Sequence, residues 1–260
     1  MPAWFGAACV LLVGLAVGSF MTVVATRVPV GEGIVRGRSH CDHCDYELRW
    51  YDNIPVLSWI LVGGKCRRCR TGIGVLYPAM EVATAALWLA VWWRYGLTWT
   101  VALLAVFAAA SVALTVIDVI HHRLPHAVVR TTAILVVVLA LAVWITGEQG
   151  PWWRALAGAG ILGGFYGVLW VVYPKGMGFG DVTTATLGGG VLGLLGWTPL
   201  MVGAIAGPLL GGVIVAVGLA AKRTSWGKAI PYGPALLGGV WVGILAGEAI
   251  GAAYLGMLGL

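Results

Sequence analysis

The chain has 260 residues, of which 60% are hydrophobic and only 10% are charged, and its mean hydropathy is +0.93. This composition excludes a soluble globular protein, because so few polar side chains cannot cover a folded surface. It predicts an integral membrane protein, and the formal net charge of +6 needs no nucleic-acid partner, since membrane topology and anionic lipid account for it.

Apolar runs long enough to cross a bilayer follow one another along most of the chain. A spanning helix needs about 20 apolar residues, and the sequence predicts an all-α polytopic protein with about eight such helices. The first run is too long, and too lightly charged before its apolar core, to be a cleaved signal peptide, so we expect it to remain as an anchor. The predicted spans are 4–26, 78–95, 98–120, 126–146, 152–173, 181–197, 199–221 and 234–258. The predicted organisation is a first transmembrane helix (1–26), a polar module (27–77) and a seven-helix membrane domain (78–260).

Lys and Arg residues orient these spans. If the polar module is cytoplasmic, only Arg94 and Arg154 of the 16 Lys and Arg residues lie on the outside. Cytoplasmic loops carry the excess of Lys and Arg, so the sequence predicts an inner-membrane protein with both termini outside and the module in the cytoplasm. The cytoplasmic set is Arg27, Arg36, Arg38, Arg49, Lys65, Arg67, Arg68, Arg70, Arg123, Arg130, Lys175, Lys222, Arg223 and Lys228.

Two CxxC pairs stand in the polar module: Cys41 with Cys44, and Cys66 with Cys69. Because the cytoplasm disfavours disulfides, two such pairs predict a tetrahedral, all-thiolate zinc site. Four ligands leave no open position, so this zinc is predicted to be structural. A redox dithiol would need only one pair, placed on a helix.

Other residues could enter the metal site. His40 or His43 could replace one of the cysteines. Cys9, inside the first span, is expected to be a buried small apolar residue and not a fifth ligand.

Carboxylates in or beside a span are costly, so each is a functional candidate. There are four: Glu81, Asp118, Asp181 and Glu248. Asp118 ends the third predicted span and Asp181 begins the sixth, which runs the opposite way, so both are expected at the cytoplasmic face. Two carboxylates together in a low-dielectric place cannot both ionise easily, and the pair can supply the acid and base that activate water against a peptide carbonyl. Glu81 in a first helical turn and Glu248 deeper in the membrane are expected to be structural, with a role for Glu81 beside the site left open.

Glycines precede the second aspartate. Gly176, Gly178 and Gly180 lead directly into Asp181. They let the backbone approach a bound chain, and they place Asp181 at a helix start. A phosphate-binding loop is the competing interpretation, but no Lys-Ser/Thr follows.

Histidines follow the first aspartate. His121, His122 and His126 come shortly after Asp118, around a turn at Pro125. They could bind a metal together with Asp118, or mark a wet membrane edge. The sequence contains neither His-Glu-x-x-His nor Gly-x-Ser-Gly, which argues against an intramembrane metalloprotease or serine protease.

In this order, the motifs resemble those of the prepilin leader peptidases of type IV pilus and type II secretion systems, which are membrane aspartic peptidases. The resemblance covers nearly the whole chain. Its residues are Gly18-Ser19-Phe20, Arg27-Val28-Pro29, Arg38 to Cys44, Leu48 to Pro55, Cys66 to Cys69, Tyr77-Pro78 with Glu81, Asp118 with Leu124-Pro125, Gly176 to Asp181, and Ile230 to Pro234.

The resemblance implies cleavage of prepilin and pseudopilin leaders after a glycine at the cytoplasmic membrane face, with Asp118 and Asp181 as the catalytic pair. It also implies, for many members, methylation of the new amino terminus with S-adenosylmethionine. We expect Gly176, Gly178 and Gly180 to admit the extended substrate and Tyr232 to line the site.

Three positions depart from the family pattern. His126 stands where Asp or Asn is frequent, Thr183 stands where a Lys is common, and the first cysteine pair lacks a common proline. The missing lysine removes a cation that would favour an ionised acid. The rival hypotheses are a non-enzymatic assembly scaffold, whose module binds a partner, and a transporter that uses the two aspartates as a proton relay.

Overall fold

The structure is a computed structural model that describes residues 3–34, 39–41, 43–174, 176–221 and 231–259. Some residues used above lie outside these ranges: Arg36, Arg38, Lys175, Lys222, Arg223, Lys228 and Ile230.

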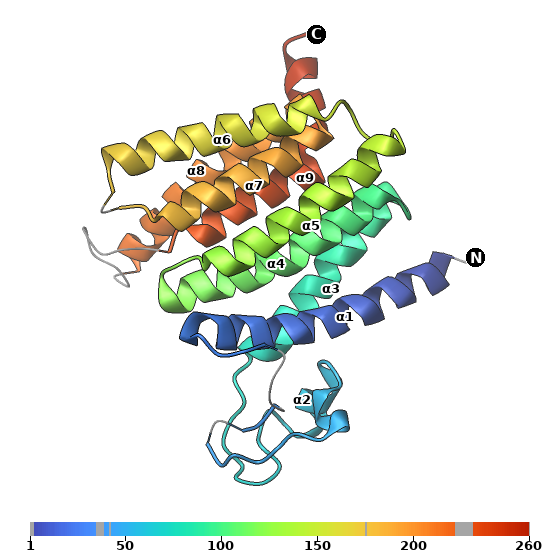
Figure 1. Cartoon of the computed structure of the whole chain (residues 1–260), viewed down its shortest axis with the longest axis vertical. Coiled ribbons are helices and arrows are strands. Elements are labelled where there is room, and N and C mark those ends of the chain that lie inside the picture. Colours follow the sequence, from blue (N-terminus) through green and yellow to red (C-terminus); the bar gives the residue numbers. More distant parts are fainter. Residues whose placement is uncertain (1–2, 35–38, 42, 175, 222–230, 260) are drawn as a thin grey trace. The chain divides into compact units, whose positions relative to one another are not determined.

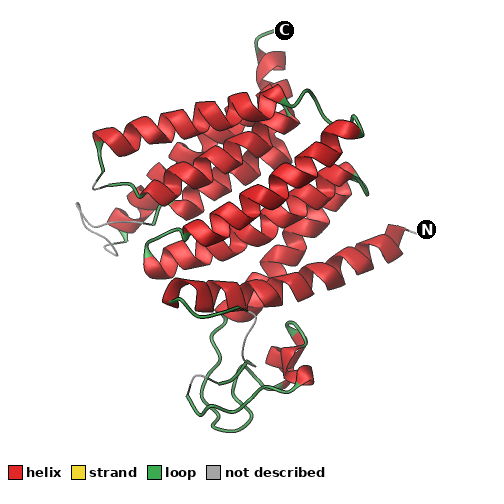
Figure 2. Cartoon of the chain, viewed as in Figure 1, coloured by secondary structure: helices red, strands yellow, loops and turns green. Residues whose placement is uncertain are grey.

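Most of the described residues are helical, the polar module is largely loop, and the described ranges contain no strand longer than an isolated bridge (Figure 2). Two 3₁₀ turns and one short helix belong to the polar module: η1 (Val28–Val30), η2 (Trp50–Asn53) and α2 (Leu57–Leu61). The long helices are α1 (Ala3–Arg27), α3 (Leu76–Tyr95), α4 (Trp99–His121), α5 (His126–Ile145), α6 (Trp153–Val172), α7 (Phe179–Leu195), α8 (Trp197–Ala220) and α9 (Gly233–Met257).

These eight long helices confirm the all-α membrane fold. Six of them are long and apolar enough to cross a membrane, namely α1, α4, α5, α6, α8 and α9. The 17-residue α7 is the shorter apolar helix, corresponding to the glycine-rich sixth span. α3 has 20 residues but a less apolar sequence, which includes Glu81 and Arg94.

Two compact units divide the chain: Met1–Gly96 with Ala108–Ala113, and Leu97–Phe107 with Leu114–Leu260. In the first unit, α1 and α3 pack closely because Gly14 and Gly18 face the backbone of α3. A Cβ atom at Gly18 would lie 2.7 Å from the Cα atom of Glu81. Small residues four apart let membrane helices approach in this way.

In the second unit, α6 lies beside α7 and α8 lies beside α9 (Figure 1). Glycines form both contacts. Gly158 of α6 meets the backbone of Gly189 on α7, and Gly207 of α8 meets Gly239 on α9, too closely in each case for a side chain. Lipid supplies no hydrophobic force between helices, so this close packing is what holds the pairs together.

The start of α4 is capped by an acid from a distant loop. Glu148, after α5, accepts hydrogen bonds from the backbone N–H groups of Trp99 and Thr100 at 3.0 and 2.8 Å, and from the Thr100 hydroxyl at 3.0 Å. Burial acts to raise the pKa of Glu148, but these hydrogen bonds outweigh it and leave that pKa below its ordinary value.

We therefore expect Glu148→Gln to lower stability in detergent at neutral pH by up to about 1 kcal/mol, a small value because water partly screens the carboxylate. Because the folded-state pKa is depressed, the Glu148 contribution is present above its unfolded pKa of about 4.3 and is lost as the pH falls through the folded value. Thermal unfolding of both proteins should differ at pH 7 and converge well below pH 4. A gap that widened on acidification would contradict this role.

Candidate active site and metal centre

The first predicted acid lies one turn before the end of α4. Asp118 is buried, with 5% of its surface exposed, and its Oδ2 accepts the backbone N–H of Gly233 at 2.7 Å. α4 ends just beyond it, because His122 takes a left-handed conformation and donates its N–H to the carbonyl of Asp118. A Cβ atom at Gly233 would lie 2.7 Å from Asp118 Oδ2, so only glycine allows this contact.

The second predicted acid lies in the first turn of α7. Asp181 is half-buried, and its Oδ2 accepts the N–H of Gly178 at 3.0 Å, which caps the helix. The positive end of the helix dipole also favours a carboxylate at this position. Asp118 and Asp181 thus each hold one backbone amide with one oxygen.

The two acids share an electrostatic neighbourhood. The charge of Asp118 acts on the Asp181 carboxyl, and that of Asp181 acts on both Tyr166 and Tyr232. The hydroxyls of the two tyrosines lie 2.9 Å apart. Gly233, which binds Asp118, follows Tyr232 directly. Segments from α4, α6, α7 and the start of α9 therefore meet around these acids.

Tyr166 was not predicted from the sequence. It stands inside an apolar span and belongs to none of the motifs discussed above. Its one signal is chemical, since a hydroxyl in the middle of a spanning helix needs a hydrogen-bond partner.

The glycines before Asp181 have different surroundings. Gly178 is the N-cap residue of α7, and Gly176 is packed too tightly against the Tyr173 ring to carry a side chain. A Cβ atom at Gly180 would lie 3.0 Å from the carbonyl oxygen of Leu124, so this glycine lets α7 approach the loop that follows α4.

Two of the residues that depart from the family pattern, His126 and Thr183, contact or belong to the first turns of α7. The His126 ring, at the start of α5, lies against Phe179 of α7 with centroids 5.8 Å apart. The Thr183 hydroxyl donates to the carbonyl of Gly180 at 2.9 Å, within its own helix. Neither residue replaces one of the acids.

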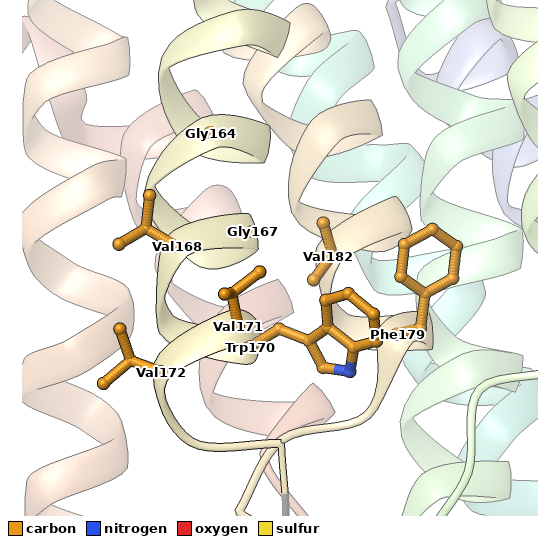
Figure 3. Close-up of a pocket in the computed structure, with 8 residues that line it drawn as sticks. All are labelled: Gly164, Gly167, Val168, Trp170, Val171, Val172, Phe179 and Val182. Carbon is orange, nitrogen blue, oxygen red and sulfur yellow. The ribbon is translucent and has the colours of Figure 1, made fainter.

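An apolar groove adjoins the first turn of α7, with a volume of about 470 Å³ (Figure 3). Phe179 and Val182, on either side of Asp181 in sequence, line it from α7, and Trp170 lines it from α6. The remaining lining residues are Gly164, Gly167, Val168, Val171 and Val172. Asp181 itself is not in the lining, so the groove is a neighbour of the acids and offers only apolar contact.

The four predicted metal ligands form one cluster in the first unit. The Sγ atoms of Cys41, Cys44, Cys66 and Cys69 all lie within 4.8 Å of one another. Zinc–sulfur bonds of about 2.3 Å in a tetrahedron place sulfur atoms about 3.8 Å apart. The Cys41–Cys69 and Cys44–Cys66 separations are 3.8 and 3.9 Å, so this donor set fits a zinc ion.

Each cysteine pair lies in its own turn, and the two turns have the same geometry. The N–H of Cys41 donates to the carbonyl of Tyr46, and that of Cys66 donates to Thr71. Asp45 and Arg70, which follow the second cysteine of each pair, both take positive φ values of 53° and 62°. The repeated geometry brings two similar hairpin turns to one metal position.

The thiols do not share one pKa. The N–H of Tyr46 acts to lower the pKa of Cys44, but burial and the neighbouring thiols prevail and raise it to about 11. Hydrogen bonding with the Thr71 side chain and backbone lowers the pKa of Cys69 to about 6. Metal binding favours the thiolate of all four, so zinc affinity should fall in acid.

The remaining candidates lie apart from the metal and the paired acids. Among the described residues, His40 and His43 are not in the cysteine cluster, and Cys9 is exposed on α1. The expectation that Cys9 is buried was wrong, because a membrane helix can leave one apolar face without protein cover. Glu248 lies near Gly196, at the far end of α7 from Asp181, since a Cβ atom there would be 3.5 Å from Glu248 Oε1.

Glu81 is buried in α3 and accepts the backbone N–H of Val56 at 2.7 Å. Val56 has φ +60°, an uncommon value for a β-branched residue. The carboxylate therefore ties the start of α2, whose N-cap residue is Val56, to the first turns of α3.

The fold and these sites define an integral membrane protein with one buried and one half-buried acid in its membrane domain, and a four-cysteine cluster that could hold a metal ion. Residues 12–95 match the bacterial peptidase A24 N-terminal domain, and residues 105–217 match the type IV leader peptidase family. The chain therefore belongs to the type IV leader peptidase family and is a peptidase.

Individual relatives support this assignment. The prepilin leader peptidase/N-methyltransferase of Stutzerimonas stutzeri is 30% identical, covering 95% of this chain and 93% of the relative. The protein of the same name in Myxococcus xanthus is 34% identical, with 90% and 72% covered. The type 4 prepilin-like proteins leader peptide-processing enzyme of Escherichia coli O78:H11 is 33% identical, with 87% and 89% covered. No solved structure matches the chain.

Proposed function

We propose that this protein is an inner-membrane aspartic endopeptidase that removes the leader of prepilins and pseudopilins after a glycine. The observation that carries the proposal is the placement of two acids, Asp118 and Asp181, in the segment that matches the peptidase family. Each orients one oxygen on a backbone amide, and Gly180, beside Asp181, packs against Leu124 in the loop after α4. The names of the relatives supply the substrate class.

Each step of the proposed reaction uses one of these acids. The charged carboxylate accepts a proton from water, the water oxygen attacks the peptide carbonyl carbon, and the protonated acid donates to the carbonyl oxygen. As the C–N bond of the tetrahedral intermediate breaks, the acid that took the proton from water gives it to the leaving nitrogen. The other acid takes a proton back from a hydroxyl of the intermediate as the new carboxyl group forms, so both acids return to their starting states. The bound amides of Gly178 and Gly233 hold the acids in orientation during these transfers.

The substrate would meet the acids at the cytoplasmic face. The Lys and Arg distribution supports placing the loop after α4 and the start of α7 there. A substrate with a basic leader and an apolar stem would have its junction at the same boundary, with lipid around the stem. Of the glycines before Asp181, Gly178 leaves room beside an extended backbone, since a Cβ atom there would have no close neighbour nearer than Asp181 Oδ2 at 3.5 Å.

For the metal we propose zinc in a structural role. Cys41, Cys44, Cys66 and Cys69 would hold it, and four thiolates fill a tetrahedral zinc and leave no position for substrate. The second activity in the relatives' names, N-methylation, would require a methyl donor such as S-adenosylmethionine.

One experiment tests the activity. Purified protein is incubated in detergent or nanodiscs with a full-length prepilin, and the product's amino terminus is determined by mass spectrometry. We expect a new terminus directly after a glycine, and addition of S-adenosylmethionine shows whether that terminus gains a methyl group. An uncut prepilin, with a known prepilin peptidase active in parallel, would contradict the proposal.

A further inference from the structure

A pair of tyrosines lies next to the turn that holds Asp118. Tyr166 is buried in α6, with 3% of its surface exposed, and its hydroxyl lies 2.9 Å from that of Tyr232, just before α9. The ring centroids are 5.8 Å apart. The sequence positions are 66 residues apart, so the contact is a product of the tertiary fold.

Glycines of α8 make room for both rings. A Cβ atom at Gly207 would lie 3.3 Å from the Tyr166 hydroxyl, and one at Gly211 would lie 2.8 Å from Cε2 of Tyr232. These glycines are four residues apart, so they share one helix face. The two tyrosine rings therefore pack against this glycine face of α8, and this packing restricts the positions of their hydroxyls.

The pair connects to both acids. Tyr232 immediately precedes Gly233, whose N–H donates to Asp118 Oδ2 at 2.7 Å. The charge of Asp181 acts on both tyrosines. A shift of the Tyr232 ring would therefore disturb the amide that orients Asp118 and the polar surroundings of Asp181 together.

The hydrogen bond between the two tyrosines leaves one hydroxyl proton available. Two hydroxyls carry two protons, and the bond between them uses one. The other remains for a further acceptor, such as water or an acid. Either hydroxyl can be the donor, and in both cases the bond fixes the position of the Tyr232 oxygen.

We propose that Tyr166 is a positioning residue of the peptidase, which acts by fixing the Tyr232 hydroxyl and, with it, the turn that holds Asp118. This inference rests on the proposed function. It differs from a plain packing role, in which the Tyr166 hydroxyl merely satisfies a buried hydrogen bond and has no effect on turnover.

The test compares Tyr166→Phe, Tyr232→Phe and the double variant in the prepilin cleavage assay. We expect Tyr166→Phe to lower kcat between about three- and tenfold, the range for one neutral hydrogen bond, at an unchanged KM. Because Tyr166 acts through Tyr232, the double variant should be no slower than Tyr232→Phe alone. Tyr254→Phe, at the exposed end of α9, is the matched control and should retain wild-type kcat.

A wild-type kcat in Tyr166→Phe, or independent multiplication of the two losses in the double variant, would overturn the inference. Should Tyr166→Phe fail to fold, Tyr232→Phe removes the same bond from outside the spans, and full activity in that variant would also overturn it. Wild-type cleavage in the same assay separates these outcomes from a failure of the proposed function itself.

Discussion

Asp118→Asn and Asp181→Asn should each insert and fold normally yet lose about 10³-fold or more of the prepilin cleavage rate. An asparagine side-chain oxygen can still accept the amide of Gly233 or Gly178, so the hydrogen bonds that position these residues survive. What disappears is the ability to take or give a proton. The measurement is cleavage of a co-expressed prepilin, followed by single-turnover rates with purified protein.

Glu248→Gln is the control for removal of an acid from the membrane domain, because Glu248 lies by Gly196 at the far end of α7. It should cleave at the wild-type rate. Normal processing by either aspartate variant would remove the basis for the acid-base mechanism. The assembly-scaffold and proton-relay hypotheses both require that prepilin be left uncut by the wild type as well.

Replacing a zinc ligand should have the second large effect. Cys66→Ser and Cys41→Ser should reduce bound zinc from about one equivalent to near zero, because a structural site loses most of its affinity with one thiolate. If folding of so small a module depends on the proposed zinc, the segment between α1 and α3 should become sensitive to protease. Elemental analysis and limited proteolysis in detergent measure the two effects.

Cys9→Ser is the matched control, since Cys9 lies on α1 outside the cysteine cluster, and it should keep its zinc. Wild-type protein with less than about half an equivalent of zinc would contradict a metal on which folding depends. Full zinc content in Cys66→Ser would contradict the four-cysteine ligand set.

The long helices were predictable because the bilayer imposes their length. Each predicted span begins and ends within a few residues of an observed helix; 126–146, for example, corresponds to α5 at His126–Ile145. The short elements of the module were not predicted. η2 and α2, of four and five residues, are too short for a hydrophobic pattern to predict them. Long-range contacts, such as that between Glu81 and the N–H of Val56 at the start of α2, help to fix them.

The candidate site also contains residues that the sequence predicts and one that it does not. Counting spans predicts that Asp118 and Asp181 lie at one membrane face, because the direction of the chain alternates with each crossing, and this stays a prediction. The cysteine cluster could be predicted because CxxC spacing carries its own geometry. The role proposed for Tyr166 could not be predicted from the sequence. It depends on contact with Tyr232, 66 residues away, and on packing against two glycines of a third helix, α8.

The central claim is that the two aspartates act on one water molecule. An experimental structure with a hydroxyl-containing transition-state analogue of a prepilin junction would test it most directly, because such a hydroxyl takes the place of the attacking water. We predict that carboxylate oxygens of both Asp118 and Asp181 lie within about 3 Å of that single hydroxyl. A bound analogue whose hydroxyl contacts only one aspartate, with the other facing away, would contradict it.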